Sequence, residues 1–197
     1  MSLLGDIRSY LGHREIEKII AEGRRRPVIP DMEKLRSILI LFRSGVRAYD
    51  CSVAADKDPE ENAYIQKLSN EFRKKGVHVY AWGYVEEKKE TQTPRRKEYR
   101  LFGKGELKKI DGLPTKELTE EFDAVGIVDL VIDLDLENKA PLDFLLARSR
   151  GRLKVSGMKP YANISDFVIK LEKDMNKPQV FYEQAMFYLN SIKGKND

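Results

Sequence analysis

Cysteine is almost missing from this chain of 197 residues, because Cys51 is the only one. A lone cysteine excludes a disulfide within the chain and a zinc site built from cysteines, and it fits a reducing compartment. Histidine is nearly as scarce, with only His13 and His78, and the sequence lacks a Gly-x-Ser-x-Gly nucleophile elbow. These shortages argue against a hydrolase of the Ser-His-Asp or Cys-His type.

Long apolar runs are missing as well. The longest clear one covers residues 38–42, whereas a helix needs about 20 apolar residues to cross a bilayer. Asp6 and Arg8 interrupt the start of the chain, where a secretory signal needs a continuous apolar segment. An excess of one charge is also absent, since 36 basic residues nearly balance 32 acidic ones. We therefore expect a cytoplasmic protein without a membrane partner.

The composition that remains is globular, with 41% hydrophobic and 35% charged residues. An amphipathic pattern predicts a helical arm and linker over residues 1–30, ended by Arg24–Arg26 and two prolines. Residues 31–197 are expected to form a single α/β domain. The arm is expected to pack on its own domain or on a second copy, which makes a homo-oligomer possible; binding to a membrane surface is the alternative.

Two strand-helix-strand units predict the fold. In the first, a strand over 37–42 precedes a helix that begins near Asp58-Pro59 and stops at Gly76, and a strand over 77–85 follows. The second has a strand over 127–134, a helix from about Pro141 and a strand over 153–155. Further strands are expected at 99–102 and 167–171, with helices at 115–122 and 180–192, and residues 86–98 form a charged loop. Such units pair in parallel through right-handed crossovers, which predicts a three-layer α/β fold with a mostly parallel, doubly wound (Rossmann-like) sheet.

Two acidic residues lie at the carboxyl end of the apolar strand over 127–134. Ligands of open α/β sheets collect at the carboxyl ends of the strands, so Asp133 and Asp135 mark the expected functional edge. Their Asp-x-Asp spacing suits a shared divalent cation and matches a pattern of one class of glycosyltransferases, but two ligands fall short of what such a cation needs. Solvated or helix-capping carboxylates are the favoured interpretation, and we expect no metal and no cofactor.

A glycine turn between two arginines ends the first strand. Arg43, Gly45 and Arg47 could receive a phosphate or carboxylate there. The turn lacks both the Gly-x-Gly-x-x-Gly fingerprint and the Walker lysine, so it indicates no nucleotide class. The plainer interpretation is a turn glycine beside exposed arginines.

Three basic clusters raise the question of RNA. They cover residues 24–26, 95–97 and 148–154, and aromatic residues surround the second in the sequence. Stacking and phosphate contacts of this kind bind single-stranded RNA. Acidic neighbours such as Glu86 and Glu98 neutralise the second cluster, so we expect no nucleic-acid partner.

The chain resembles an uncharacterised family of small cytoplasmic α/β proteins from Bacteroidota, a domain of unknown function. The resemblance rests on residues 122–123, 128–134, 140–142, 146–149 and 153–157, and on the segment 181–184 with Tyr188-Leu189. A weaker likeness links residues 131–134 and the following helix to the acceptor half of heptosyltransferase-like glycosyltransferases, although the chain lacks their second, nucleotide-sugar domain. The first resemblance implies a fold and no activity.

Together these patterns favour a noncatalytic domain that binds a small polar ligand or a protein partner. Its candidate ligand residues are Arg43, Gly45, Arg47, Asp133 and Asp135, and no residue is nominated as catalytic. The alternatives are an enzyme or enzyme subunit acting on a phosphorylated or glycosyl substrate and, second, an RNA-binding protein.

Overall fold

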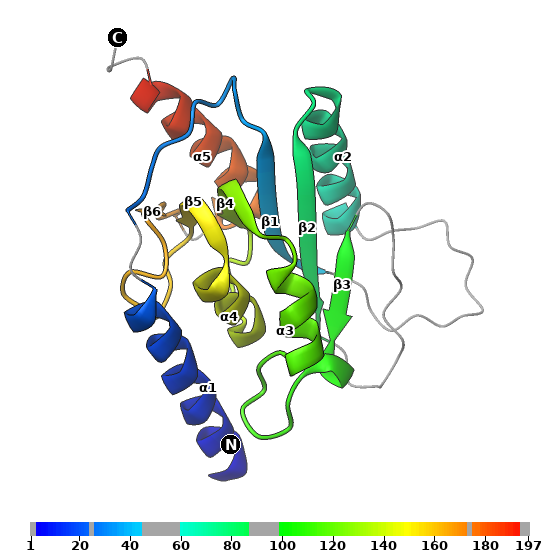
Figure 1. The fold of residues 1–197 in the computed structure, drawn as a ribbon, viewed down its shortest axis with the longest axis vertical. Coiled ribbons are helices and arrows are strands. Elements are labelled where there is room, and N and C mark those ends of the chain that lie inside the picture. Colours follow the sequence, from blue (N-terminus) through cyan, green and yellow to red (C-terminus); the bar gives the residue numbers. More distant parts are fainter. Residues whose placement is uncertain (1–2, 24–25, 45–59, 87–98, 173–174, 194–197) are drawn as a thin grey trace, which may run out of the picture.

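The protein is described here from a computed structural model, which covers residues 3–23, 26–44, 60–86, 99–172 and 175–193. Six parallel strands form one sheet in the order β3-β2-β1-β4-β5-β6 (Figure 1). The strands are β1 (Ser37–Ser44), β2 (His78–Val85), β3 (Arg100–Gly103), β4 (Ile127–Asp133), β5 (Arg150–Ser156) and β6 (Phe167–Val168). The helices are α1 (Leu3–Glu22), α2 (Glu60–Lys74), α3 (Lys116–Asp123), α4 (Ala140–Arg148) and α5 (Pro178–Lys193), with a short 3-10 helix, η1 (Lys104–Glu106).

The side of the sheet on which new strands are added changes once along the chain. From β1 the chain adds β2 and β3 on one side, and it then returns to place β4, β5 and β6 on the other. The strand order therefore switches between β1 and β4, and in sheets of this kind the crevice outside the carboxyl ends of those two strands receives ligands. The predicted Rossmann-like fold is confirmed, and all the strand pairs are parallel.

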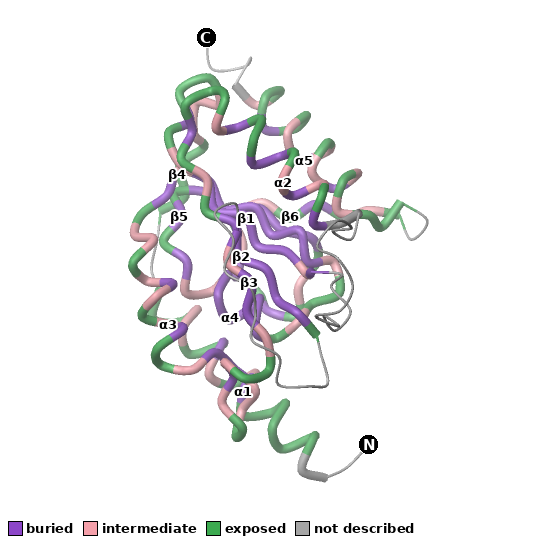
Figure 2. The backbone as a smooth tube through the Cα atoms, turned by 90° about the vertical axis from the view of Figure 1, so that its right-hand side faces the viewer, coloured by how far each residue is buried: buried purple, intermediate pink, exposed green. Residues whose placement is uncertain are grey.

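Helices cover both faces of the sheet, so the fold has three layers (Figure 2). Residues of β1 alternate between two apolar clusters because successive side chains of a strand point to opposite faces. Ile38, Ile40 and Phe42 belong to the cluster under α2 and α5, whereas Leu39 and Leu41 belong to the cluster under α1, α3 and α4.

The helical arm packs on the sheet's own covering layer. Figure 1 shows α1 beside α4, and Ile16 of α1 is completely buried in the second apolar cluster. The ring of His13 lies 4.4 Å from that of Tyr161. Within the described ranges, no helix has both the length and the apolar character needed to cross a membrane.

Local sequence signals explain several element ends. The Thr115 side chain accepts a hydrogen bond from Leu118 N at 3.4 Å and caps α3. Gly76, after α2, has a φ of 78°, in the left-handed region that favours glycine.

The last strand is shorter than the predicted one over 167–171. Strand β6 has two residues, which pair with Val155 and Ser156 of β5. Earlier along β5, the linker pairs instead, because Val28 N donates to Arg152 O at 3.0 Å.

Candidate functional site

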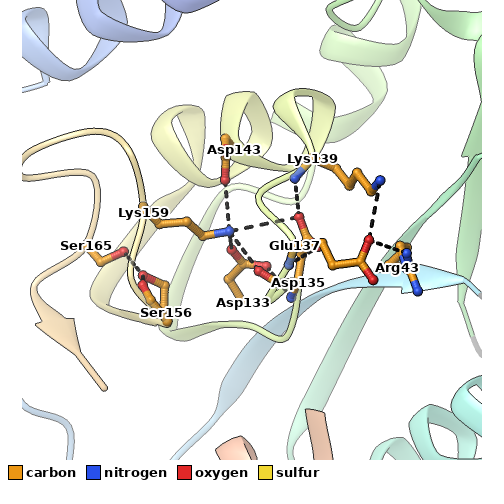
Figure 3. Close-up of polar contacts among 10 residues, drawn as sticks. Arg43, Asp133, Asp135, Glu137, Lys139, Asp143, Ser156, Lys159 and Ser165 are labelled. Atoms are coloured by element: carbon orange, nitrogen blue, oxygen red, sulfur yellow. Dashed lines mark hydrogen bonds and ion pairs between the residues drawn. The ribbon is translucent and has the colours of Figure 1, made fainter. Parts of the chain in front are cut away.

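A buried lysine lies among three aspartates at the carboxyl edge of the sheet (Figure 3). Lys159 Nζ is 2.6 Å from Asp133 Oδ2, 2.9 Å from Asp143 Oδ1 and 4.0 Å from Asp135 Oδ2. It also donates a hydrogen bond to Asp135 O at 2.9 Å. All four side chains are at most 1% exposed. We call Asp133, Asp135, Asp143 and Lys159 the buried ionic cluster.

Burial and charge shift the pKa values in this cluster. Burial raises the pKa of Asp133 to about 7, although the Lys159 ammonium opposes the shift. Burial likewise raises the pKa of Asp143, again against the effect of Lys159. Burial by itself would lower the pKa of Lys159, but the carboxylates of Asp133, Asp143 and Asp135 outweigh it and raise that pKa above its usual value. The ammonium therefore stays charged, and three carboxylates compete for it.

Asp135 also fixes the loop that leads into α4. Its Oδ1 accepts a hydrogen bond from Glu137 N at 3.1 Å and its Oδ2 accepts one from Lys139 N at 2.5 Å. Lys139 is the residue before α4, so this carboxylate satisfies a backbone N–H at the helix start. Asp133 Oδ1 accepts in the same way from Asp135 N at 3.0 Å. The two aspartates thus shape the turn between β4 and α4.

A row of alternating charges crosses the same edge nearer the surface. Lys139 Nζ lies 2.6 Å from Glu86 Oε2 and 3.4 Å from Glu137 Oε2. Glu137 Oε2 also pairs with Arg43 Nη1 at the end of β1. The hydrogen bond from Lys139 lowers the pKa of Glu86. This row connects the exits of β2, β1 and β4, as the right side of Figure 3 shows for Arg43, Glu137 and Lys139.

A cavity of about 420 Å³ lies where β1 and β4 end. This volume falls in the range of small-molecule sites. Its polar and charged lining consists of Arg43, Tyr64, Asp135, Glu137, Asn176, Lys177 and Gln179, and its apolar lining of Phe42, Ile65, Leu134, Leu136 and Pro178. Burial raises the pKa of the Tyr64 hydroxyl, so this group remains a hydrogen-bond donor at neutral pH. We call this cavity the carboxyl-edge pocket.

The structure places the residues nominated from the sequence as follows. Arg43 and Asp135 both line the carboxyl-edge pocket, whereas Asp133 lies behind it in the buried ionic cluster. Gly45 and Arg47 lie outside the described residues. The favoured interpretation, solvated or helix-capping carboxylates, is wrong as to solvation, because both aspartates are buried. Asp135 accepts a hydrogen bond from the N–H of Lys139, the N-cap residue of α4, but it does not itself cap the helix.

Lys159 and Asp143 were missed by the sequence analysis. Lys159 follows β5, whose carboxyl end neighbours that of β4, and this strand neighbourhood is the signal that could have found it. Its ammonium lies where a cation bound by Asp133 and Asp143 would have to lie. Among the residues that the structure describes, no three histidine, cysteine or acidic side chains are arranged to hold a metal ion.

Comparison with known proteins adds one match. No curated protein and no solved structure is significantly similar to the chain. A protein-family model for a family of unknown function, DUF6913, matches residues 49–192, which is more than half of the chain. The matched region runs from before α2 into α5 and includes the buried ionic cluster. The chain therefore belongs to this family of unknown function.

Proposed function

We propose that the protein is a noncatalytic domain that binds a small polar ligand in the carboxyl-edge pocket. One observation carries the proposal: Arg43 from β1 and Asp135 from the β4 exit, which are distant in the sequence, line one cavity at the switch in strand order. The same edge receives ligands throughout open α/β sheets.

The lining supports a ligand rich in hydroxyl groups with at most one strongly acidic group. Among the described residues that line the pocket, two are cationic, Arg43 and Lys177, and two are acidic, Asp135 and Glu137. Such balanced charge does not suit a polyphosphate, which would need an excess of cations. Tyr64 and Gln179 add neutral hydrogen-bonding groups, and the apolar lining shields them from water.

Catalysis is the less supported alternative. A reaction on a phosphorylated or glycosyl substrate needs an acid, base or nucleophile that reaches the substrate. Asp133 and Lys159 have the required chemistry, but their side chains are at most 1% exposed and contact each other. The finer resemblances, to proteins of Bacteroidota and to heptosyltransferase-like enzymes, remain hypotheses, as does the cytoplasmic location that a single cysteine favours.

A thermal-shift screen tests the proposal. Sugars, sugar acids, sugar monophosphates and nucleoside monophosphates would be added to the wild-type protein at millimolar concentration. A ligand at 100 times its Kd stabilises the native state by about 2.7 kcal/mol. For a domain of this size that raises the Tm by roughly 5–10 °C.

Arg43→Gln and Arg36→Gln form a matched pair of variants for any ligand found. Arg43 lies near the carboxyl end of β1 and lines the pocket, whereas Arg36 immediately precedes the same strand at its opposite end. The Tm rise should shrink in Arg43→Gln and persist in Arg36→Gln. A screen without any rise in Tm, or a rise equal in both variants, would refute binding at this pocket.

A further inference from the structure

A second cavity lies toward the amino ends of β4 and β5, on the face covered by α1 and α4. Its volume is about 630 Å³. The lining comes from the ends of α1, α3 and α4, the starts of β4 and β5, and the segment after β5. None of its lining residues belongs to the carboxyl-edge pocket, so the two cavities are separate. We call this cavity the amino-edge groove.

One part of the groove is aliphatic. Its apolar lining consists of Ile19, Ile20, Ile127, Ala147 and Ile164. Ile127, the first residue of β4, is 63% exposed. A large aliphatic side chain exposed at the mouth of a cavity offers a surface that water solvates poorly, and an aliphatic group bound there would cover it.

The other part of the groove is cationic. Lys154 is a charged residue only 2% exposed, and its Nζ donates to Leu146 O at 2.6 Å and to Ala147 O at 2.9 Å. These carbonyls belong to the last turn of α4, where the helix carries partial negative charge. The ammonium counteracts that charge, so the end of α4 does not repel an anion from the groove.

Two arginines continue this cationic side. Arg148 is held by Asp123, whose Oδ1 accepts from Arg148 Nε at 2.8 Å. Arg150 is exposed at the start of β5. Among the described lining residues, the three cationic ones outnumber the two acidic ones, Asp123 and Glu22, and Asp123 already has a partner in Arg148.

We propose that the amino-edge groove binds an amphipathic organic anion, with a carboxylate or phosphate head attached to an aliphatic body. The head would lie near Arg150 and the other cations, and the body would lie on the isoleucines. This site is independent of the carboxyl-edge pocket and stands whether or not that pocket binds a ligand.

Methyl NMR on the full chain tests the groove with decanoate as the probe. The δ1 methyl groups of Ile19, Ile20, Ile127 and Ile164 report on the groove, and that of Ile65 reports on the carboxyl-edge pocket. We expect decanoate to change the chemical shifts of the four groove methyl groups in a saturable way and to leave the Ile65 signal unchanged. Decyl phosphate, tested in parallel, identifies the preferred head group. Decyltrimethylammonium, which has the same chain and the opposite charge, should not shift them.

Arg150→Gln and Arg152→Gln provide matched variants, because both residues are exposed arginines on β5 and only Arg150 lines the groove. Loss of one charge-assisted contact should weaken decanoate binding roughly five- to tenfold in Arg150→Gln. Arg152→Gln should bind like the wild type. The proposal is overturned if the groove signals do not move, if the cationic probe binds equally well, or if the two variants are indistinguishable.

Discussion

At the residue scale, Lys159 acts as an internal counterion for the β4 exit. Its ammonium contacts Asp133 and Asp143 and donates to the backbone oxygen of Asp135. It thereby ties the segment after β5 to the loop that forms one wall of the carboxyl-edge pocket. Removing one partner from a buried ion pair leaves an uncompensated charge, which costs more than the pair contributes.

Lys159→Met should therefore lower the free energy of unfolding by about 3–5 kcal/mol, because three buried carboxylates lose their common cation. Urea unfolding at pH 7 measures this change. Lys170→Met serves as the control, since Lys170 is exposed and a surface substitution changes stability by about 0.5 kcal/mol or less. Equal stability of the two variants would show that the cluster contributes nothing to folding.

The raised pKa of Asp133 predicts how stability depends on pH. Its folded-state pKa of about 7 lies above the ordinary value of 3.8. The folded state therefore holds this proton more tightly than the unfolded chain, and the resulting stability is present below about pH 4 and lost as the pH rises through 7. Asp133→Asn mimics the protonated form, so the fall in Tm between pH 5 and pH 8 should be smaller in this variant than in the wild type.

Asp6→Asn is the control for this experiment, because Asp6 is exposed on α1. Its Tm should follow the wild-type pH dependence. Asp143 also has a raised pKa, and both variants retain this residue. An unchanged fall in Asp133→Asn would mean that Asp133 stays ionised in the folded state over this range.

At the element scale, close packing of side chains on neighbouring strands depends on Gly83 of β2. A Cβ atom at Gly83 would lie 2.5 Å from Phe42 Cζ and 2.6 Å from Leu101 Cδ2. Both neighbours are buried: Phe42 lies on the adjacent strand β1 and Leu101 on the adjacent strand β3. Phe42 also lines the carboxyl-edge pocket, so this contact connects sheet packing with the site.

Gly83→Ala should lower the free energy of unfolding by about 1–3 kcal/mol, the usual cost of overpacking a core. Gly105→Ala is the matched control, because a Cβ there meets nothing within 4 Å. Chemical denaturation of both variants gives the comparison. A loss in Gly105→Ala as large as that in Gly83→Ala would contradict the steric explanation.

Most elements were predictable because their signals are local. The capped and glycine-terminated helices and the apolar strands depend on neighbours in the sequence, and α2, α3, β2 and β4 begin and end within a few residues of the predicted positions. The length of β6 was not predictable, since it depends on how many residues of β5 have backbone groups available for pairing. The strand order was left open by the sequence as well, because pairing joins residues far apart in the chain.

The candidate site was predictable only in part, for the same reason. The rule for strand ends located Arg43 and Asp135 at the pocket. It could not show that Asp133 is buried against Lys159, because that contact joins the exits of two different strands. The contributions of Tyr64 and of residues 176–179 likewise come from elements that meet only in the folded chain.

At the scale of the whole molecule, α1 completes the apolar layer over β4 and β5. Ile16 is completely buried in the core cluster that contains Leu142 and Leu145. Ile7, in the same helix, is 49% exposed. The arm thus has one part that belongs to the core and one that faces solvent.

Ile16→Ala should destabilise the whole protein by about 2–5 kcal/mol, the usual cost of such a truncation in a core. Ile7→Ala should change stability by about 0.5 kcal/mol or less. We expect one unfolding transition by both circular dichroism and Trp82 fluorescence in Ile16→Ala. An early transition confined to the helical signal would show instead that the arm unfolds separately from the sheet.

The two outermost strands are the shortest of the six, with four residues in β3 and two in β6, and the linker at Val28 takes up part of the rim of β5. A strand from another molecule can extend a sheet only where the edge strand offers a long row of unpaired backbone N–H and C=O groups. The described borders of this sheet offer only short stretches of that kind. Crowded copies of the chain should accordingly resist stacking into cross-β fibres, even though the interior strands are rich in β-branched and aliphatic residues.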